Sequence, residues 1–395
     1  MSYADGSLPV LGSGDSSPGR AFRPTLPVQQ SDYPSFWRTP AWSWWLPVVA
    51  LVVTVLLTLV ASGIFFGVAM AIDVSSGRTD LEGWDPTEIT ALVFLANNLG
   101  LATLIPISFL ISTWLFKQRP GWVSSVVGAL RWRWLGKCLL LLTPLWALYV
   151  GVDIGLGLWQ GGGLDLAVTP DTWVLIVGIL LTTPLQVTGE EYGFRGVANR
   201  AVASFFRNPR IAVIAGAAVS SVMFMFAHAA ADPWLNGYYL WFGLAACYLT
   251  WRTGGLEAAI AMHLVNNLLS EVLLPFSDLG EIFNRDVGAA GPAVLLGMAV
   301  VGIGVVLIVR NADRQGLVRT AAPAASMVPR PSMPPPPMVP PPPMVPRPPL
   351  PPPPMVPRPP LPQRTPGLPT APPRAMEDHE PLINPRPWES TRPDR

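Results

Sequence analysis

Long apolar runs alternate with short polar segments between residues 45 and 309 of this chain. A helix needs about 20 mostly apolar residues to cross the hydrocarbon core of a membrane. The pattern therefore predicts an all-α, polytopic membrane helix bundle with about eight transmembrane helices. The predicted spans cover approximately residues 45–71, 90–115, 137–158, 172–189, 211–229, 236–251, 255–274 and 289–309. We expect the fourth helix to continue beyond its apolar run, because residues 190–206 keep helical character.

The two ends of the chain differ from this apolar body. Residues 1–40 contain Gly, Ser, Pro and Asp without periodicity, which predicts a disordered N-terminus. Residues 313–395 are rich in proline and repeat a Met-Val-Pro unit, which is typical of an extended polyproline II tail without a packed core. We therefore expect a disordered N-terminus (1–40), a transmembrane domain (41–312) and a disordered tail (313–395).

The simplest interpretation of the tail is a flexible spacer. The sequence Pro-Arg-Pro-Pro-Leu-Pro occurs twice, at Pro346–Pro351 and at Pro357–Pro362. Such a motif fits the grooves of proline-recognising domains, so a proline-recognising partner is the alternative interpretation.

Charge and composition narrow the class of protein. Charged residues make up only 13% of the chain, against roughly 25% in soluble domains. The net charge of +1, without a basic face, argues against nucleic-acid binding.

Loops rich in Lys and Arg alternate with acidic or neutral loops, which predicts a multi-pass protein of the cell membrane with both termini cytoplasmic. The abundance of Ala, Gly, Pro, Arg and Trp is typical of bacterial proteins. Cys138 and Cys247 lie in apolar runs and should pack as small hydrophobic residues.

Ionisable residues interrupt the apolar body at Gly189–Arg195, and such residues are costly in a membrane and usually functional. Glu191 and Arg195 are four residues apart, so they share a helix face and can form an ion pair. Glu190 then points about 100° away from that pair. A carboxylate in a dry pocket becomes a better base near neutral pH, so Glu190 is the candidate general base.

Two further polar positions interrupt later helices. His228 follows Phe224 by four residues, and His263 is followed by Asn266 and Asn267. Counting along the helices from the arginine-rich turns places Glu190 and His228 about 25 Å deep and His263 and Asn267 about 16–22 Å deep. We therefore expect these side chains to converge. Asn267 shares a face with His263, although the adjacent Asn266 is an alternative for the inward position.

Converging Glu, His and Asn side chains predict hydrolysis. Glu190 would take a proton from water, and one histidine together with Asn267 would stabilise the resulting oxyanion. The alternative is a divalent metal such as zinc, held by His228, His263 and Glu190. The sequence leaves both possibilities open.

The three motifs resemble those of the CPBP family, which comprises CAAX prenyl endopeptidases and bacteriocin-processing relatives. They are Glu-Glu-x-x-x-Arg at 190–195, Phe-x-x-x-His at 224–228 and His-x-x-x-Asn at 263–267, within residues 170–275. The resemblance implies a catalytic set with Arg195 as the structural partner of Glu191. Its members are Glu190, Glu191, His228, His263 and Asn267.

These observations predict an intramembrane endopeptidase that cleaves a membrane-associated peptide or protein. Two other functions remain: a proton-coupled transporter, because buried Glu and His also form proton relays, and a non-catalytic scaffold that uses its proline-rich tail. No inverted repeat supports transport. The intact motifs argue against a scaffold.

Overall fold

The computed structural model describes residues 23–80, 89–163, 166–277, 279 and 284–327. The chain divides into two units, 1–331 and 332–395, and the second lies outside the described residues. The first unit is built from helices. The transmembrane part contains α1 (Trp45–Ser75), α2 (Ala91–Ala102), α3 (Leu104–Leu110), η2 (Ile111–Leu115), α5 (Trp132–Trp159), α6 (Thr172–Glu191), η3 (Tyr192–Ala198), α7 (Asn199–Ala203), α8 (Pro209–Ala227), α9 (Pro233–Thr253), α10 (Glu257–Ser270), η4 (Leu274–Phe276) and α12 (Val294–Arg314).

Within the described ranges, seven helical segments are long and apolar enough to cross a membrane. The predicted all-α membrane bundle is therefore confirmed. Helix α9 also has the length of a span but is not among the seven, because tyrosine, tryptophan and asparagine residues make its sequence less apolar. The predicted extension of the fourth helix is confirmed as well, since α6 continues through η3 and α7 to Ala203.

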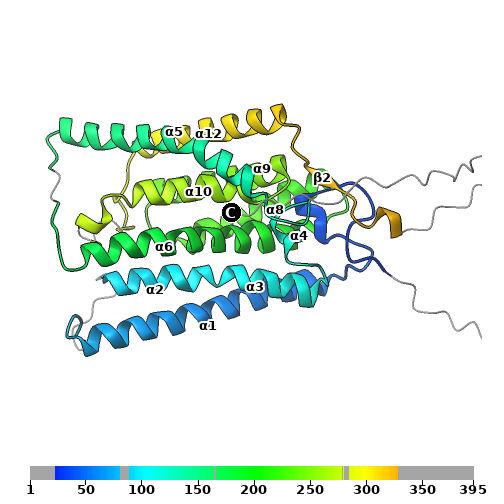
Figure 1. Ribbon diagram of the computed structural model, residues 1–395, viewed down its shortest axis with the longest axis horizontal. Helices are drawn as coiled ribbons and strands as arrows, with labels where there is room; N and C mark the ends of the chain where they lie inside the picture. The colour runs from blue at the N-terminus through cyan, green and yellow to red at the C-terminus, as the bar shows by residue number, and fades with distance from the viewer. Residues whose placement is uncertain (1–22, 81–88, 164–165, 278, 280–283, 328–395) are drawn as a thin grey trace, which may run out of the picture. The chain divides into compact units, whose positions relative to one another are not determined.

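Helix α10 lies inside the bundle, in contact with α5, α6 and α9 (Figure 1). Helix α6 also packs against α2, which packs against α1, while α9 packs against α8 and α12. The largest buried cluster joins α5, α9, α10 and α12, with Cys138 as one of its members. Both cysteines are buried and free, as predicted.

Helix α6 approaches α2 closely at Gly189. A Cβ atom at this position would lie 2.3 Å from the backbone oxygen of Leu101, so only glycine fits without displacing a helix. Directly after Glu191 the helix widens into the π-helical segment η3. Such π-helical segments occur frequently at functional sites.

The prediction of disorder across residues 1–40 is wrong for residues 23–40, which are folded. Their short helix η1 (Tyr33–Trp37) buries the rings of Tyr33, Phe36 and Trp37. The Tyr33 hydroxyl donates to the Val123 carbonyl, and the buried Arg200 guanidinium lies 3.6 Å from the Tyr33 ring centroid. These three aromatic side chains provide the apolar burial that the surrounding Ser, Asp and Pro residues lack. Residues 1–22 lie outside the described residues.

The beginning of the predicted tail, 313–395, is folded too. Strand β2 (Thr320–Ala321) pairs antiparallel with β1 (Ser31–Asp32), and the short helix η5 (Ala325–Met327) follows. The proline-rich repeats from residue 328 onward lie outside the described residues.

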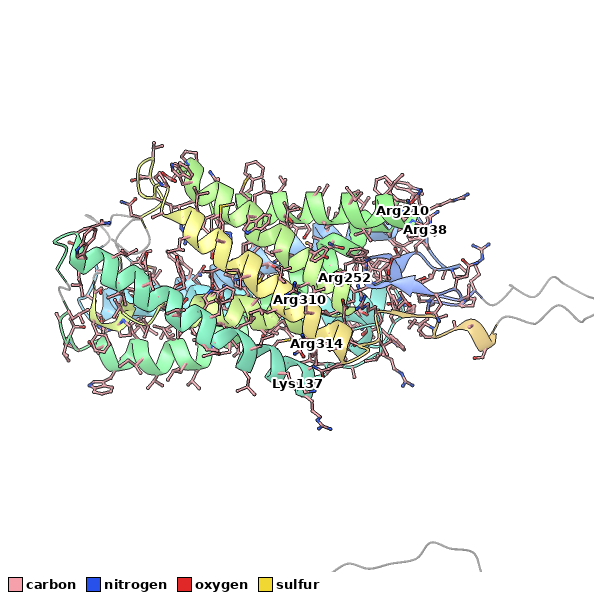
Figure 2. All side chains as sticks on the ribbon, turned by 90° about the horizontal axis from the view of Figure 1, so that it is seen from above. Arg38, Lys137, Arg210, Arg252, Arg310 and Arg314 are labelled. Carbon is pink, nitrogen blue, oxygen red and sulfur yellow. The ribbon has the colours of Figure 1, made fainter. Side chains whose placement is uncertain are left out.

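Basic side chains gather towards the end of the bundle that carries β1 and β2. Figure 2 shows this distribution for the labelled residues Arg38, Lys137, Arg210, Arg252, Arg310 and Arg314. The charge pattern in the sequence therefore corresponds to one end of the folded bundle.

Candidate active site

The candidate active site lies along the seam between α6 and α10. On α6, Thr183, Gln186 and Glu190 follow one another at helical spacing. On α10, His263 and Asn267 do the same, and Glu271 caps the end of the helix. Side chains at this spacing share one helix face. Hydrogen bonds or close approaches join the two faces at three levels: His263 with both glutamates, Asn267 with Gln186, and Glu271 with Thr183.

Glu191 and Arg195 form the ion pair that their spacing predicts. Arg195 Nη1 lies 3.0 Å from Glu191 Oε1, and both side chains are completely buried. The guanidinium also donates to the Gly243 carbonyl and lies 4.5 Å from the Phe224 ring centroid. The two opposite charges therefore compensate each other inside the bundle.

Glu191 has a second partner that helical spacing did not reveal. His263 Nδ1 lies 2.8 Å from the same Glu191 oxygen, and because a carboxylate only accepts, Nδ1 donates this bond. The bond orients the imidazole so that Nε2 faces Glu190, 3.7 Å from Oε2. Glu191 therefore positions His263 in addition to pairing with Arg195.

Glu190 is held through one of its two carboxylate oxygens. Gln186 Nε2 donates to Oε1 at 2.6 Å. The other oxygen, Oε2, is buried and has no hydrogen-bond partner within the described part of the chain. Buried polar atoms are nearly always hydrogen-bonded, so such an oxygen requires an explanation, and a catalytic role is one.

The two adjacent asparagines point to different partners. Asn267 Nδ2 approaches Gln186 Oε1 at 3.4 Å, within the seam. Asn266 Oδ1 instead accepts from the Tyr238 hydroxyl at 2.7 Å and from Trp146 Nε1 at 3.2 Å. Asn267 is therefore the asparagine that contacts α6, through Gln186, and Asn266 links α10 to α5 and α9.

His228 lies at the end of α8, half-buried beside the seam. Its Nδ1 donates to the Phe224 carbonyl at 2.8 Å, and its ring stacks on Tyr239 with centroids 3.9 Å apart. The Phe224 ring is close to both histidines, at 4.5 Å from His228 and 5.8 Å from His263. The Phe224 ring therefore packs against both imidazoles.

The turn after His228 is fixed by its backbone and by a loop contact. Ala229 adopts φ = 50°, a left-handed conformation that is uncommon for residues other than glycine. Arg285 donates to the His228 carbonyl at 3.1 Å. Asp232 caps α9: burial alone would raise its pKa, but backbone amides of Leu235 and Gly288 bond its carboxylate and hold the pKa below the ordinary value.

The residue types fit zinc in part. Each histidine directs Nδ1 to an oxygen acceptor, which leaves Nε2 as the nitrogen for a metal, an arrangement common in metalloenzymes. However, no three His, Cys, Asp or Glu side chains among the described residues are grouped closely enough to hold a metal ion. The donor chemistry fits a metal, whereas the arrangement of the donors does not.

Sequence reasoning missed Gln186 and Tyr239. Gln186 precedes Glu190 by four residues, so the spacing rule that paired Glu191 with Arg195 could have identified it. Tyr239 lies on α9, and no spacing along the chain relates it to His228. Glu271 continues the face of His263 and Asn267 but bonds Thr183, at 2.8 Å.

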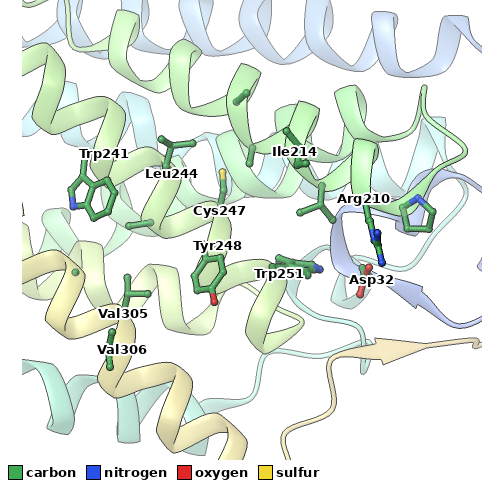
Figure 3. A pocket seen from close by; sticks show the side chains of 16 residues that line it. Asp32, Arg210, Ile214, Trp241, Leu244, Cys247, Tyr248, Trp251, Val305 and Val306 are labelled. Atoms are coloured by element: carbon green, nitrogen blue, oxygen red, sulfur yellow. The ribbon is translucent and has the colours of Figure 1, made fainter.

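A large apolar groove of about 1110 Å³ lies between α8, α9 and α12 (Figure 3). Its lining includes Trp241, Leu244 and Tyr248 on α9 and Val305 on α12. None of the candidate catalytic residues lines this groove. The candidate active site is therefore separate from it.

Residues 170–269 match the family described as type II CAAX prenyl endopeptidase Rce1-like. The matched segment runs from the start of α6 almost to the end of α10 and contains all three motifs. No curated protein and no solved structure matches the chain significantly.

The match confirms the resemblance derived from the motifs and favours proteolysis over transport or a scaffold role. A membrane-embedded protease also implies contact with the lipid bilayer and with a peptide or protein substrate. The chain is therefore a multi-pass membrane protein whose residues 170–269 resemble the type II CAAX prenyl endopeptidases, which are intramembrane proteases.

Proposed function

We propose that this protein hydrolyses a peptide bond of a membrane-associated peptide or protein, with Glu190 as the base that activates water. One observation carries the proposal. Glu190 is held through Oε1, while its buried Oε2 has no hydrogen-bond partner among the described residues and faces His263 Nε2 at 3.7 Å. This geometry leaves one oxygen of an anchored carboxylate available to a reacting water.

In the proposed reaction, Glu190 Oε2 takes a proton from water as the water oxygen bonds to the substrate carbonyl carbon. One histidine and the Asn267 amide stabilise the oxyanion that forms. The C–N bond then breaks, and the departing nitrogen receives the proton that Glu190 had accepted. One water is consumed, and Glu190 returns to its starting state.

Glu191 and Arg195 support this reaction without touching the substrate. Arg195 is the ion-pair partner of Glu191 in an apolar interior, and Glu191 in turn orients His263. A carboxylate behind a histidine commonly fixes the tautomer and the orientation of the ring.

A metal-dependent reaction remains the alternative. Zinc held by His228, His263 and Glu190 would polarise the carbonyl and lower the pKa of a bound water. A chelator decides between the two proposals: the glutamate mechanism expects unchanged cleavage after chelation and removal of the chelator. Loss of cleavage that returns when zinc is added would favour the metal mechanism.

The central test compares wild-type protein with Glu190→Gln on a fluorogenic peptide anchored in lipid vesicles. Glutamine has nearly the same shape but cannot accept the proton, so we expect cleavage to fall by about 10²-fold or more. The unfolding temperature in detergent should stay close to that of wild type.

Glu271→Gln is the matched control, because it neutralises a second carboxylate of the seam whose partner is Thr183. This variant should retain most of the activity. Full cleavage by Glu190→Gln would overturn the proposed mechanism.

We further propose that the chain lies in the cell membrane with its basic end and both termini in the cytoplasm, following the positive-inside rule.

Prenylation of the substrate requires a separate experiment, because a bacterium without protein prenylation would need another substrate. The test uses one anchored peptide with a C-terminal Cys-a-a-X sequence, with or without an isoprenoid on the cysteine. Cleavage of the prenylated form alone would show that the isoprenoid is recognised.

A further inference from the structure

Gln186 occupies the centre of the α6–α10 seam and is buried, with 7% of its surface exposed. Its side-chain amide contacts two candidate catalytic residues at once. Nε2 donates to Glu190 Oε1 at 2.6 Å, and Oε1 accepts from Asn267 Nδ2 at 3.4 Å. The residue lies outside all three family-like motifs.

We propose that Gln186 is a positioning residue that makes Oε2 the reacting oxygen of Glu190 and aligns Asn267 for the oxyanion. This inference rests on the proposed function, because it assigns a role towards the base and the oxyanion donor of that reaction.

The hydrogen-bond chemistry fixes the orientation of the Gln186 amide. An ionised carboxylate only accepts, so the NH₂ group must face Glu190 and the carbonyl oxygen must face Asn267. Rotation of the amide by 180° would place two acceptors against each other. With its amide in this single orientation, Gln186 bonds Glu190 through its NH₂ group and Asn267 through its carbonyl oxygen.

This contact matters because the two oxygens of a free carboxylate are chemically equivalent. A donor on Oε1 removes that equivalence and leaves Oε2 facing His263, at 3.7 Å from Nε2. The Asn267 amide is held by a longer contact, which leaves its second N–H available for the substrate oxyanion. Removal of a residue that hydrogen-bonds and orients a functional side chain typically changes activity or affinity by about 10–100-fold.

The experiment measures kcat and KM of Gln186→Met on the vesicle-anchored peptide. Methionine keeps the length of the side chain without its donor or acceptor. We expect kcat to fall by about 10–100-fold with little change in KM.

Asn98→Leu is the matched control. Asn98 lies on α2 and is also buried. It donates to Thr182 and Thr183 on α6, the helix that carries Gln186, and no hydrogen bond joins it to Glu190 among the described residues. This variant should lower stability and leave kcat close to that of wild type. An equal fall of kcat in both variants would reduce Gln186 to a structural residue and overturn the proposal.

If Gln186→Met does not fold, Gln186→Glu tests the same point, because an ionised glutamate keeps the shape but cannot donate. Wild-type kcat in a folded variant would overturn the positioning role. An active Glu190→Gln variant would instead overturn the proposed function itself. The two failures are therefore distinguishable.

Discussion

Glu191 accepts hydrogen bonds from both Arg195 and His263, and this sharing joins the stability of the bundle to the geometry of the site. The pair is fully buried, so water cannot replace a partner that is lost. An unpaired charge in this position is far more costly than an exposed one. Residues that never touch the substrate can therefore be as sensitive to substitution as Glu190.

We predict that Arg195→Met lowers the free energy of unfolding by about 3–5 kcal/mol, because it leaves the Glu191 carboxylate buried without its counter-charge. Chemical unfolding in detergent micelles measures this loss. In the double variant Glu191→Gln/Arg195→Met, the total should be smaller than the sum of the single effects. Additive losses would show that the two side chains do not interact energetically.

At the scale of residues, spacing along one helix predicted the Glu191–Arg195 pair and placed His263 on the same face as Asn267. It could not predict that His263 bonds Glu191 or that Asn266 points to Tyr238. Such contacts depend on how far each helix is rotated about its own axis. That rotation is set by packing between helices, which the hydropathy of a single helix does not determine.

The contact between α6 and α2 is the element-scale feature that limits where Glu190 can lie. Two glycines of α6 face α2, but they meet different atoms. A Cβ at Gly189 would lie 2.3 Å from the Leu101 backbone oxygen, whereas one at Gly178 would meet the flexible end of the Leu95 side chain. Backbone cannot move without shifting a whole helix, while a side chain can change rotamer.

We therefore predict that Gly189→Ala destabilises the protein by about 1–3 kcal/mol and also reduces peptide cleavage, because the displaced residue precedes Glu190. Gly178→Ala, about three turns away on the same helix, is the matched control. This variant should lower stability and peptide cleavage less than Gly189→Ala does. Unfolding in detergent and the vesicle assay give the two values. Equal losses at the two positions would show that the close approach of α6 to the α2 backbone is not their cause.

The elements themselves were largely predictable, because apolar runs of membrane length leave few alternatives to a helix. The error at residues 23–40 has a local cause. Tyr33, Phe36 and Trp37 lie among Ser, Asp and Pro residues, so the average composition concealed three side chains that are fully buried in the structure. Composition describes a segment taken alone and does not include the surface against which it packs.

At the scale of the whole molecule, the N-terminal and C-terminal segments meet at the basic end of the bundle. Strand β1 pairs with β2, and Thr320 Oγ1 donates to the Gln30 side chain, 290 residues away in sequence. Arg38 is held nearby through a 2.9 Å bond to the Ser204 carbonyl. This end of the bundle therefore depends on both ends of the chain.

We predict that a chain ending at Met327 keeps the segment 23–40 in place, because β2 and η5 are retained. A chain ending at Arg314 lacks β2, so the segment should detach more often and trypsin should cut after Arg38 at least several-fold faster. Limited proteolysis in micelles compares the rate of cutting after Arg38 in the two truncated chains. Equal cutting rates would show that aromatic burial alone holds the segment.

The pairing of β1 with β2 also has a consequence for biogenesis. Strand β1 precedes α1 and β2 follows α12, so β1 leaves the ribosome before the membrane helices that the structure describes between them. The segment that carries β1 therefore has no strand partner until α12 has been made. Contacts of such long sequence separation form late, so closure of this strand pair follows the synthesis of these helices.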